Sequence, residues 1–488
     1  MPFTTNRRHF TLGLLAGACG SRAAAATAFD PDQFERLTLA VGAHTVTVRA
    51  YTGLATVARP VEAAYQALDL YVPEAYFHGG SVGRYTAATA PIFLPNAVGG
   101  YLPARPATPD GRPGRGPGGM PPSPTAGTGP SALAVALSRG LVVAAPGARG
   151  RTLRGPDGRW TGKAPAAIVD LKAAVRWLRH NAGRLPGNPE RIVANGTSAG
   201  GALSALLGAS GNGEDYEAEL QALGAAPARD DVFAVSAYCP ITNLENADGA
   251  YEWQFHGLAE HRQGRLGDEQ LALSAQLRGD FIAYVNATGL RDAAGELLRL
   301  DAQGDGTLLA HVRALLLASA QRARDGGQDL SGLPWLRIDA GRVTGIDFAG
   351  YVRAIGRLKG VPAFDGLALE TGENSLFGDA RTDARHFTAF ASDHSRVPRA
   401  ALADMLTVRQ MNPMAQLADA RTRPARHWRI RHGSADRDTS LAVPALLAAA
   451  ARERSAAVDL AFPWDRPHGG DYDLDDLFAW IDAAVAAG

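Results

Sequence analysis

The chain has 488 residues, and its 49 lysines and arginines balance 49 aspartates and glutamates, so the formal net charge is zero. Such a balance provides neither a basic surface for nucleic acid nor an acidic tail, and we expect no nucleic-acid partner and no polyanionic ligand. The length suits one α/β domain with a large insertion. Only two cysteines are present, Cys19 and Cys239.

Residues 1–28 have the order of an export signal. Asn6-Arg7-Arg8-His9-Phe10 precedes a short apolar run, Leu12 to Ala18, and an alanine-rich stretch that ends at Ala28. The run is too short to span a bilayer, and this order of charged, apolar and small residues indicates a cleavable signal. The paired arginines followed by phenylalanine resemble a twin-arginine signal. We expect cleavage after Ala28 and a periplasmic or secreted protein.

The same segment decides what the cysteines can do. Cys19 lies within the removable signal, so the mature chain keeps Cys239 alone, which excludes disulfides and a cysteine-rich metal site. Lipidation of Cys19 remains an alternative, although the leucine usual three residues before a lipidated cysteine is absent.

After the signal the chain shows the rhythm of a parallel sheet with crossover helices. Leu37 to Val41 and Thr45 to Tyr51 alternate apolar and polar residues around Gly42-Ala43-His44, which predicts an antiparallel hairpin at a sheet edge. Apolar β-branched runs then alternate with helical patterns, as is typical of α/β folds. The predicted strands are Pro91 to Pro95, Leu141 to Ala145 and Arg191 to Ala194, and the predicted helices are Ala132 to Ser138 and Ala166 to Asn181.

Two stretches depart from this rhythm. Ala104 to Pro130 consists mainly of glycine, proline, arginine and small polar residues, which cannot form a buried core and predict a flexible loop. From residue 242 to residue 402, amphipathic helices such as Leu271 to Asn286 and Leu308 to Ala323 replace the strands. We interpret residues 242–402 as an inserted lid domain.

The sheet pattern returns after residue 402. Trp428 to His432 and Val458 to Phe462 are predicted strands, separated by a helix around Pro444 to Arg454 and followed by a closing helix at Leu474 to Ala486. The insertion therefore interrupts one sheet. The main domain is predicted to be discontinuous, formed by residues 29–241 and 403–488.

A Gly-X-Ser-X-Gly motif, Gly196 to Gly200, lies where a predicted strand meets a helix-prone segment. Its glycines allow the strained turn that raises Ser198 above a helix N-terminus, which is the nucleophile position of an α/β-hydrolase fold. The motif alone is weak evidence, because Gly79 to Gly83 matches it as well. No helical pattern follows Ser81, so Ser198 is the predicted nucleophile.

A serine nucleophile needs a base and an acid, which this fold supplies later in the chain, each in a loop after a strand. Asp436 follows the strand that ends at His432, and His468 follows the strand that ends at Phe462. One crossover helix separates the two strands, as the fold requires. We therefore predict a triad of Ser198, Asp436 and His468.

Simpler interpretations of the acid and the base stay open at this point. Asp436 could cap the next helix, and His468 could be an ordinary surface histidine. His432 and His394 are rival bases, but His432 precedes the acid and His394 falls within the insertion.

The oxyanion hole is expected to use the backbone N–H of Ala199, which follows the nucleophile, and a second N–H from the loop after an early strand. Pro91 to Pro95 leads into a loop that contains Gly99 and Gly100, and either could donate, or both could merely shape a turn. No metal or cofactor is expected.

Seven blocks spread along the chain resemble bacterial tannases. They are Pro95 to Tyr101, Gly196 to Gly201, Tyr238 to Thr242, Pro362 to Asp365, Glu373-Asn374, Asp436 to Ser440 and His468 to Tyr472. The resemblance implies an α/β-hydrolase that cleaves galloyl esters, with Ser198, Asp436 and His468 as its triad. It also implies galloyl binding by Lys359, Glu373 and Asp438. Ala104 to Pro130 departs from the family pattern by its length and composition.

The three implied binding residues suit the chemistry of gallate. Its three adjacent phenolic hydroxyls need carboxylates as acceptors and a cation that favours phenolate character. Without the resemblance, Lys359 could equally be a solvated lysine, Glu373 a surface acid and Asp438 a helix N-cap.

Two other functions remain possible at this stage. A feruloyl or general aryl carboxylesterase would use the same triad with a different acid pocket. A non-catalytic binding protein with this fold is the other alternative, but such proteins usually lack a triad member, and none is missing here.

Overall fold

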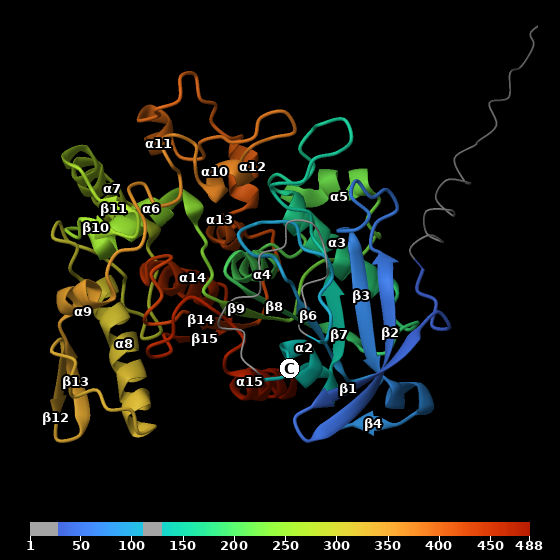
Figure 1. Ribbon diagram of the computed structural model, residues 1–488. Coiled ribbons are helices and arrows are strands. Elements are labelled where there is room, and N and C mark those ends of the chain that lie inside the picture. Colours follow the sequence, from blue (N-terminus) through green and yellow to red (C-terminus); the bar gives the residue numbers. More distant parts are fainter. Residues whose placement is uncertain (1–27, 111–128) are drawn as a thin grey trace, which may run out of the picture.

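The computed structural model describes residues 28–110 and 129–488, shown in colour in Figure 1. Residues 1–27 of the expected signal and residues 111–128 of the Gly/Pro-rich stretch lie outside these ranges. Within the described ranges, no helix has the length and apolar character needed to cross a membrane.

A nine-stranded sheet forms the centre of the molecule, in the order β1-β2-β3-β7-β6-β8-β9-β14-β15. The first four strands in this order pair antiparallel, and all pairs from β7 onwards are parallel. This mostly parallel sheet with flanking helices confirms the predicted α/β-hydrolase fold. The strands are β1 Glu35–Val41, β2 His44–Ala55, β3 Ala67–Pro73, β6 Pro91–Pro95, β7 Val142–Pro146, β8 Asn188–Thr197, β9 Ala234–Tyr238, β14 His427–Arg431 and β15 Ala457–Ala461.

The strands β3, β6, β7 and β9 are buried at every position, because helices cover both faces of the sheet. α15 packs against α2, whereas α3 packs against α4. A buried ion pair joins Lys172 of α3 to Asp230, with 2.7 Å between Nζ and Oδ1, and Lys172 Nζ also donates to the carbonyl of Ser210 after α4. The helices that flank the sheet are α2 Ala132–Ser138, α3 Ala166–His180, α4 Ala199–Ala209, α5 Glu217–Leu223, α14 Ala442–Glu453 and α15 Leu474–Ala487.

Between β9 and β14 the chain leaves the sheet, and the intervening segment lies beside and above the sheet's C-terminal strands in Figure 1. Its first helix, α6, is almost wholly buried and contacts α7 and α14, so the inserted segment and the sheet share one hydrophobic core. The elements are α6 Leu244–Phe255, β10 Glu260–His261, β11 Gly264–Arg265, α7 Asp268–Thr288, α8 Thr307–Asp325, β12 Leu336–Asp339, β13 Arg342–Ile346, α9 Phe348–Ile355, α10 Gly372–Leu376, α11 Ala389–Asp393, α12 Met405–Gln410 and α13 Pro413–Ala418.

The hairpin at the sheet edge differs in one detail from the sequence prediction. His44 pairs with Val41, so it belongs to β2 and leaves Gly42-Ala43 as a two-residue turn. The second Gly-X-Ser-X-Gly match lies in β4, Ser81–Val82, which pairs with β5, Tyr85–Thr86, and is not followed by an α-helix. Two short 3-10 helices complete the described elements, η1 Glu74–His78 and η2 Glu214–Tyr216.

Candidate active site

Ser198 occupies a strained turn between β8 and α4. Its φ of 60° and ψ of −124° are rare for a residue with a side chain, and its N–H donates to the carbonyl of Tyr238 at 3.0 Å. A Cβ on Gly196 would collide with the carbonyl of Gly200, and one on Gly201 would collide with the carbonyl of Tyr238. The glycines are therefore required for the turn, which leaves Ser198 partly exposed at the N-terminus of α4.

Asp436 and His468 lie together beyond the ends of β14 and β15. Asp436 is fully buried, and its Oδ2 lies 2.8 Å from Nδ1 of His468, while its Oδ1 accepts the N–H of Asp438 at 2.8 Å. The next helix, α14, has Leu441 at its N-cap, so Asp436 is not a helix cap. His468 keeps 26% of its side chain exposed and is therefore neither free on the surface nor sealed in the core.

The electrostatics of this pair favour a carboxylate next to a strongly basic imidazole. Burial opposes ionisation of Asp436, but His432 and the hydrogen bond to His468 hold its pKa below the ordinary range. Burial likewise disfavours a charged His468, yet the hydrogen bond that His468 donates to Asp436 and the contact with Cys239 raise its pKa above the usual value. The carboxylate thus fixes the ring through Nδ1 and leaves Nε2 as the free proton acceptor.

The loop that carries His468 packs directly on the turn that carries Ser198. A Cβ on Gly470 would collide with the side chain of Thr197, the residue before the nucleophile. Although this packing brings the two loops together, no hydrogen bond between Ser198 Oγ and His468 is present in the described part of the chain. Such bonds are often long before substrate binds.

The loop after β6 is held against the N-terminus of α4. The Asn96 side-chain amide donates to the carbonyl of Gly200 at 3.0 Å and to Ser204 Oγ at 2.9 Å. A Cβ on Gly200 would lie 2.6 Å from Asn96 Oδ1 and 2.8 Å from the carbonyl of Val98, so glycine is needed for this approach.

This approach leaves backbone donors available beside the nucleophile. Ala199 is the first residue of α4 and has no acceptor within the helix for its N–H. In the described ranges the N–H groups of Gly99 and Gly100 form no hydrogen bond either, although the carbonyl of Gly100 accepts from Arg151 Nε at 2.9 Å. A Cβ on either glycine would meet no atom within 4 Å, but Gly100 has a φ of +53°, which favours glycine.

Asp438 and Lys359 approach the same region from different segments. Asp438 Oδ2 lies 3.8 Å from His468 Nδ1. The Tyr251 hydroxyl accepts the N–H of Lys359 at 3.0 Å and donates to the carbonyl of Arg437 at 3.1 Å. One phenol therefore joins the backbone that bears Lys359 to the backbone that bears Asp438.

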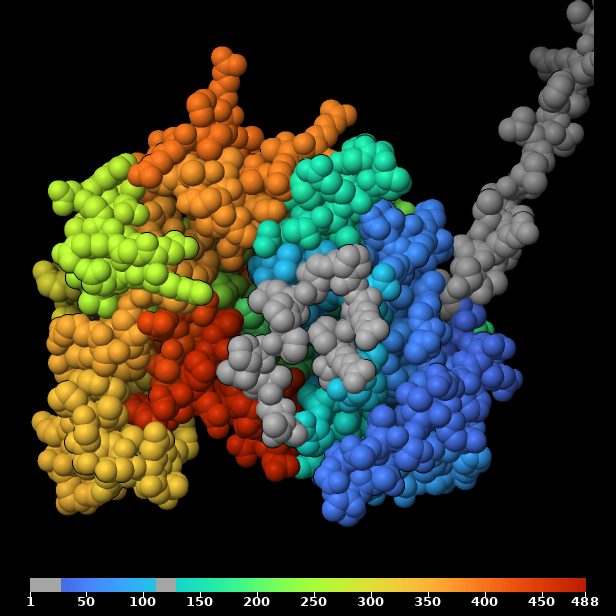
Figure 2. Space-filling view, in the orientation of Figure 1, coloured from blue at the N-terminus to red at the C-terminus, as the bar shows by residue number. Residues whose placement is uncertain are grey.

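Glu373, at the start of α10, is placed near the loop after β6. Burial and the charge of Glu373 both raise the pKa of Tyr101, the residue after Gly100. Arg151 reinforces the arrangement, because it packs against Gly372 while it donates to the carbonyl of Gly100. The inserted segment thus contacts the main domain at this loop, and Figure 2 shows orange atoms of the inserted segment against teal atoms of the main domain.

The side chains of Lys359 and Glu373 are partly buried without an ion-pair partner among the described residues. Lys359 Nζ lies 3.9 Å from the centre of the Phe364 ring, and the Glu373 carboxylate accepts no hydrogen bond from the described protein. In the same ranges, no hydrogen bond or ion pair joins either side chain to the side chain of Asp438. Such unpaired charges have the capacity to bind polar groups of a ligand.

Sequence reasoning assigned no role to Tyr251 or Cys239 and treated His432 only as a rival base. His432 is fully buried on another side of Asp436, with its Nδ1 3.6 Å from Asp436 Oδ2. His394 is exposed and bonds to the carbonyl of Phe390 within its own helical turn. A fully buried strand end is the signal that could have separated His432 from a surface base.

Comparison with known proteins defines the class first. A family model described as BD-FAE matches residues 156–286. Esterase LipC of Mycobacterium tuberculosis is 43% identical over 65 residues, which is 13% of this chain and only 15% of LipC. Carboxylesterase NlhH from the same species is 51% identical over 43 residues, 9% of this chain and 14% of its own length. Together with the fold, these matches define a carboxylic ester hydrolase of the α/β-hydrolase superfamily.

Solved structures narrow the class to one family. The tannin acyl hydrolase from Lactobacillus plantarum is 46% identical, with a TM-score of 0.88 over 94% of this chain and 99% of that one. The Fusobacterium nucleatum tannase is 42% identical, with a TM-score of 0.86 over 94% and 99%. A tannin acyl hydrolase in complex with ethyl gallate is 47% identical, with a TM-score of 0.88 over 94% and 98%. The chain belongs to the tannase family, which confirms the resemblance found in the sequence.

Proposed function

We propose that the protein hydrolyses galloyl esters and depsides and releases gallic acid, with Ser198, Asp436 and His468 as its catalytic triad. Family membership supports the substrate class, as does the ethyl gallate bound to a relative that shares 47% identity. The observation that carries the proposal is the buried Asp436 carboxylate 2.8 Å from His468 Nδ1, in a loop packed on the Ser198 turn.

The mechanism follows from this arrangement. Nε2 of His468 takes the proton of Ser198 as its Oγ attacks the ester carbonyl, and Asp436 stabilises the imidazolium that forms. The carbonyl oxygen becomes an oxyanion, which accepts from the N–H of Ala199 and of Gly99 or Gly100. His468 returns the proton to the departing alkoxide, which leaves as the alcohol and a galloyl ester on Ser198. Water, deprotonated by the same imidazole, then attacks the galloyl ester, and His468 returns that proton to Ser198 Oγ as gallic acid leaves.

Recognition of the acid is assigned to Lys359, Glu373 and Asp438. The two carboxylates would accept hydrogen bonds from the phenolic hydroxyls, and the ammonium would favour phenolate character. Because Lys359 and Glu373 belong to residues 242–402 and Asp438 to the main domain, the inserted segment acts as a lid that completes the acyl pocket. We also propose that residues 1–28 are a cleavable export signal of the twin-arginine type and that the mature protein is periplasmic or secreted.

The triad assignment is tested with variants of Ser198 and His468. Ser198→Ala and His468→Ala should each lower kcat for methyl gallate by about four or more orders of magnitude with folding intact, because the triad acts as a unit. Ser81→Ala is the matched control, since Ser81 lies in the other Gly-X-Ser-X-Gly segment, and it should behave as the wild type. A fluorophosphonate should label Ser198, as peptide mass spectrometry will reveal; full activity of Ser198→Ala would refute the assignment.

The acyl specificity is tested with Lys359→Ala, Glu373→Ala and Asp438→Asn. Each should strongly reduce kcat/KM for methyl gallate while largely sparing p-nitrophenyl acetate, which lacks the ring hydroxyls. A pocket built to bond hydroxyls rejects an analogue without them by about three to five orders of magnitude, so methyl benzoate should be poor. An equal loss on both substrates would favour a structural role, and efficient cleavage of methyl ferulate would favour the feruloyl esterase alternative.

A further inference from the structure

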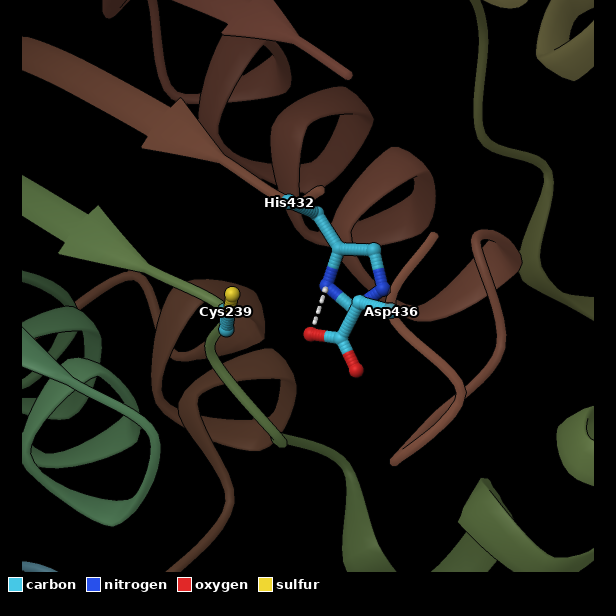
Figure 3. A group of neighbouring side chains, drawn as sticks. All are labelled: Cys239, His432 and Asp436. Atoms are coloured by element: carbon cyan, nitrogen blue, oxygen red, sulfur yellow. Dashed lines mark ion pairs between the residues drawn. The ribbon is translucent and has the colours of Figure 1, made fainter. Parts of the chain in front are cut away.

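Three buried side chains lie close together beyond the C-terminal ends of β9 and β14. Cys239 follows β9, His432 follows β14, and Asp436 lies four residues later (Figure 3). One ligand atom from each, the thiol sulfur, a ring nitrogen and a carboxylate oxygen, all lie within 4.8 Å of one another. All three residues have zero exposed surface, so this cluster lies beneath the reaction centre proposed above.

His432 is the unusual member of the cluster. Neither of its ring nitrogens forms a hydrogen bond with the described protein, although both are buried. A buried polar atom without a partner costs about 1–3 kcal/mol, and native structures contain few of them. Figure 3 shows the ring directed at Asp436, with Nδ1 3.6 Å from Oδ2, which is too long for a hydrogen bond.

The distance between His432 Nδ1 and Asp436 Oδ2 is too long for a hydrogen bond, but it suits two atoms that bind the same metal ion. Metal bonds of about 2.1 Å at tetrahedral angles separate neighbouring N and O ligands by about 3.4 Å. The cluster provides sulfur, imidazole and carboxylate donors, a set that favours borderline and soft divalent cations over Mg²⁺ or Ca²⁺. A thiolate and a carboxylate together neutralise a dication, which offsets the cost of burying its charge.

We propose that Cys239, His432 and Asp436 form a binding site for a thiophilic d10 divalent cation such as Zn²⁺, and that its occupancy inhibits the esterase. Binding exchanges the thiol proton of Cys239, which now donates to the carbonyl of Gly469 at 3.2 Å, for a metal–sulfur bond and releases that proton to solvent. The Asp436 oxygen that now accepts from His468 becomes a metal ligand. The imidazole then loses the acceptor that orients it. The inhibition, but not the binding, rests on the proposed function.

Binding is measured without reference to activity, using Cd²⁺ as the probe. Cys239 is the only cysteine outside the expected signal, so the ultraviolet charge-transfer band of a cadmium–thiolate bond in the mature protein reports this residue alone. Titration should reach one Cd²⁺ per chain, and Zn²⁺ should displace it with loss of the band. Cys239→Ala should abolish the band.

Two further variants separate this site from the neighbouring groups. His432→Asn should weaken Cd²⁺ binding by about tenfold or more, since one of three protein ligands is lost. Asp438→Asn is the matched control, because Asp438 can form only the alternative cluster with Asp436 and His468, and it should leave the band and the affinity unchanged. Circular dichroism of each variant verifies its fold.

The activity of each protein is then followed relative to its own metal-free rate. Zn²⁺ should inhibit the wild type over the concentration range in which it displaces Cd²⁺, and Cys239→Ala should resist it. Absence of the band, or equal affinity in His432→Asn, would overturn the site. A band with full activity would preserve the site but overturn the inhibition, and with it the proposed role of Asp436.

Discussion

Replacing Gly200 with alanine should impair the chemical step by displacing the loop after β6. The added Cβ would lie 2.6 Å from Asn96 Oδ1 and 2.8 Å from the carbonyl of Val98, whereas an ordinary contact is at least 3.4 Å. The loop must therefore retreat by about 0.6–0.8 Å, which takes its N–H groups out of the 2.7–3.1 Å range that an oxyanion requires. Loss of one such donor costs about 2.7–4 kcal/mol, or about two to three orders of magnitude in kcat.

Steady-state kinetics with methyl gallate distinguish this effect from loss of folding. kcat should fall by a larger factor than KM changes, because the displaced N–H groups bond the oxyanion, which forms only after the substrate has bound. The overpacking should also lower the free energy of unfolding by about 1–3 kcal/mol, measurable by denaturant titration. Gly279→Ala in α7, where no atom lies within 4 Å of the added carbon, is the control. A folded Gly200→Ala enzyme with kcat within threefold of the wild type would refute the reasoning.

Three other predictions can be tested in the same protein, two from the structure and one from the sequence. The acidic limb of the pH profile of kcat/KM should lie above pH 6.5, because the pKa of His468 is raised and only its neutral ring is a base. Asp436→Asn should shift that limb to lower pH and reduce kcat by about four orders of magnitude. A limb at the same pH in the variant would contradict this reasoning. Lys172→Met should lower the free energy of unfolding by about 1–3 kcal/mol, since the buried Asp230 carboxylate loses its lysine but keeps its ion pair with Arg176; an unchanged denaturation midpoint would count against it. N-terminal sequencing of exported protein should find the mature chain starting near Phe29, and a lipid on Cys19 would show that the leader is of another kind.

Elements with strong local signals could be predicted almost to the residue. The helix predicted at Ala132 to Ser138 has those bounds in the structure, because Ser131 caps it by accepting the N–H of Ala134 just before an apolar run. β6 also matches its predicted range, as a short apolar segment with proline at each end. In both cases the sequence signal and the tertiary environment agree.

Other elements depend on contacts that no local pattern contains. β3 was not predicted, since Asp69 interrupts its apolar run, and only the structure shows that the Asp69 carboxylate accepts the N–H of Gly53 in the adjacent strand at 2.8 Å. β9 is five small and apolar residues whose strand character comes from parallel neighbours on both sides. Tertiary pairing decided these segments.

The site divides in the same way. The serine, acid and base could be proposed by residue number, because they follow from one motif and from the rule that functional loops follow strands. The sequence could not predict the Tyr251 hydroxyl that joins two distant loops, nor the approach of Cys239 to His432. The residues in these contacts come from segments that are separated by much of the insertion. Contacts across such separations need the folded chain.

The parallel pairing of β14 with β9 sets an order of events during synthesis. Tyr238 and Arg431 are paired neighbours in space, yet about 190 residues lie between them, and closing such a loop costs about 5 kcal/mol of chain entropy. Ser198 and its turn therefore emerge from the ribosome long before the strands that position Asp436 and His468. With the proposed triad, a nascent chain that stops before β14 holds the nucleophile without its acid or its base, so hydrolysis can begin only after the last strands have been translated.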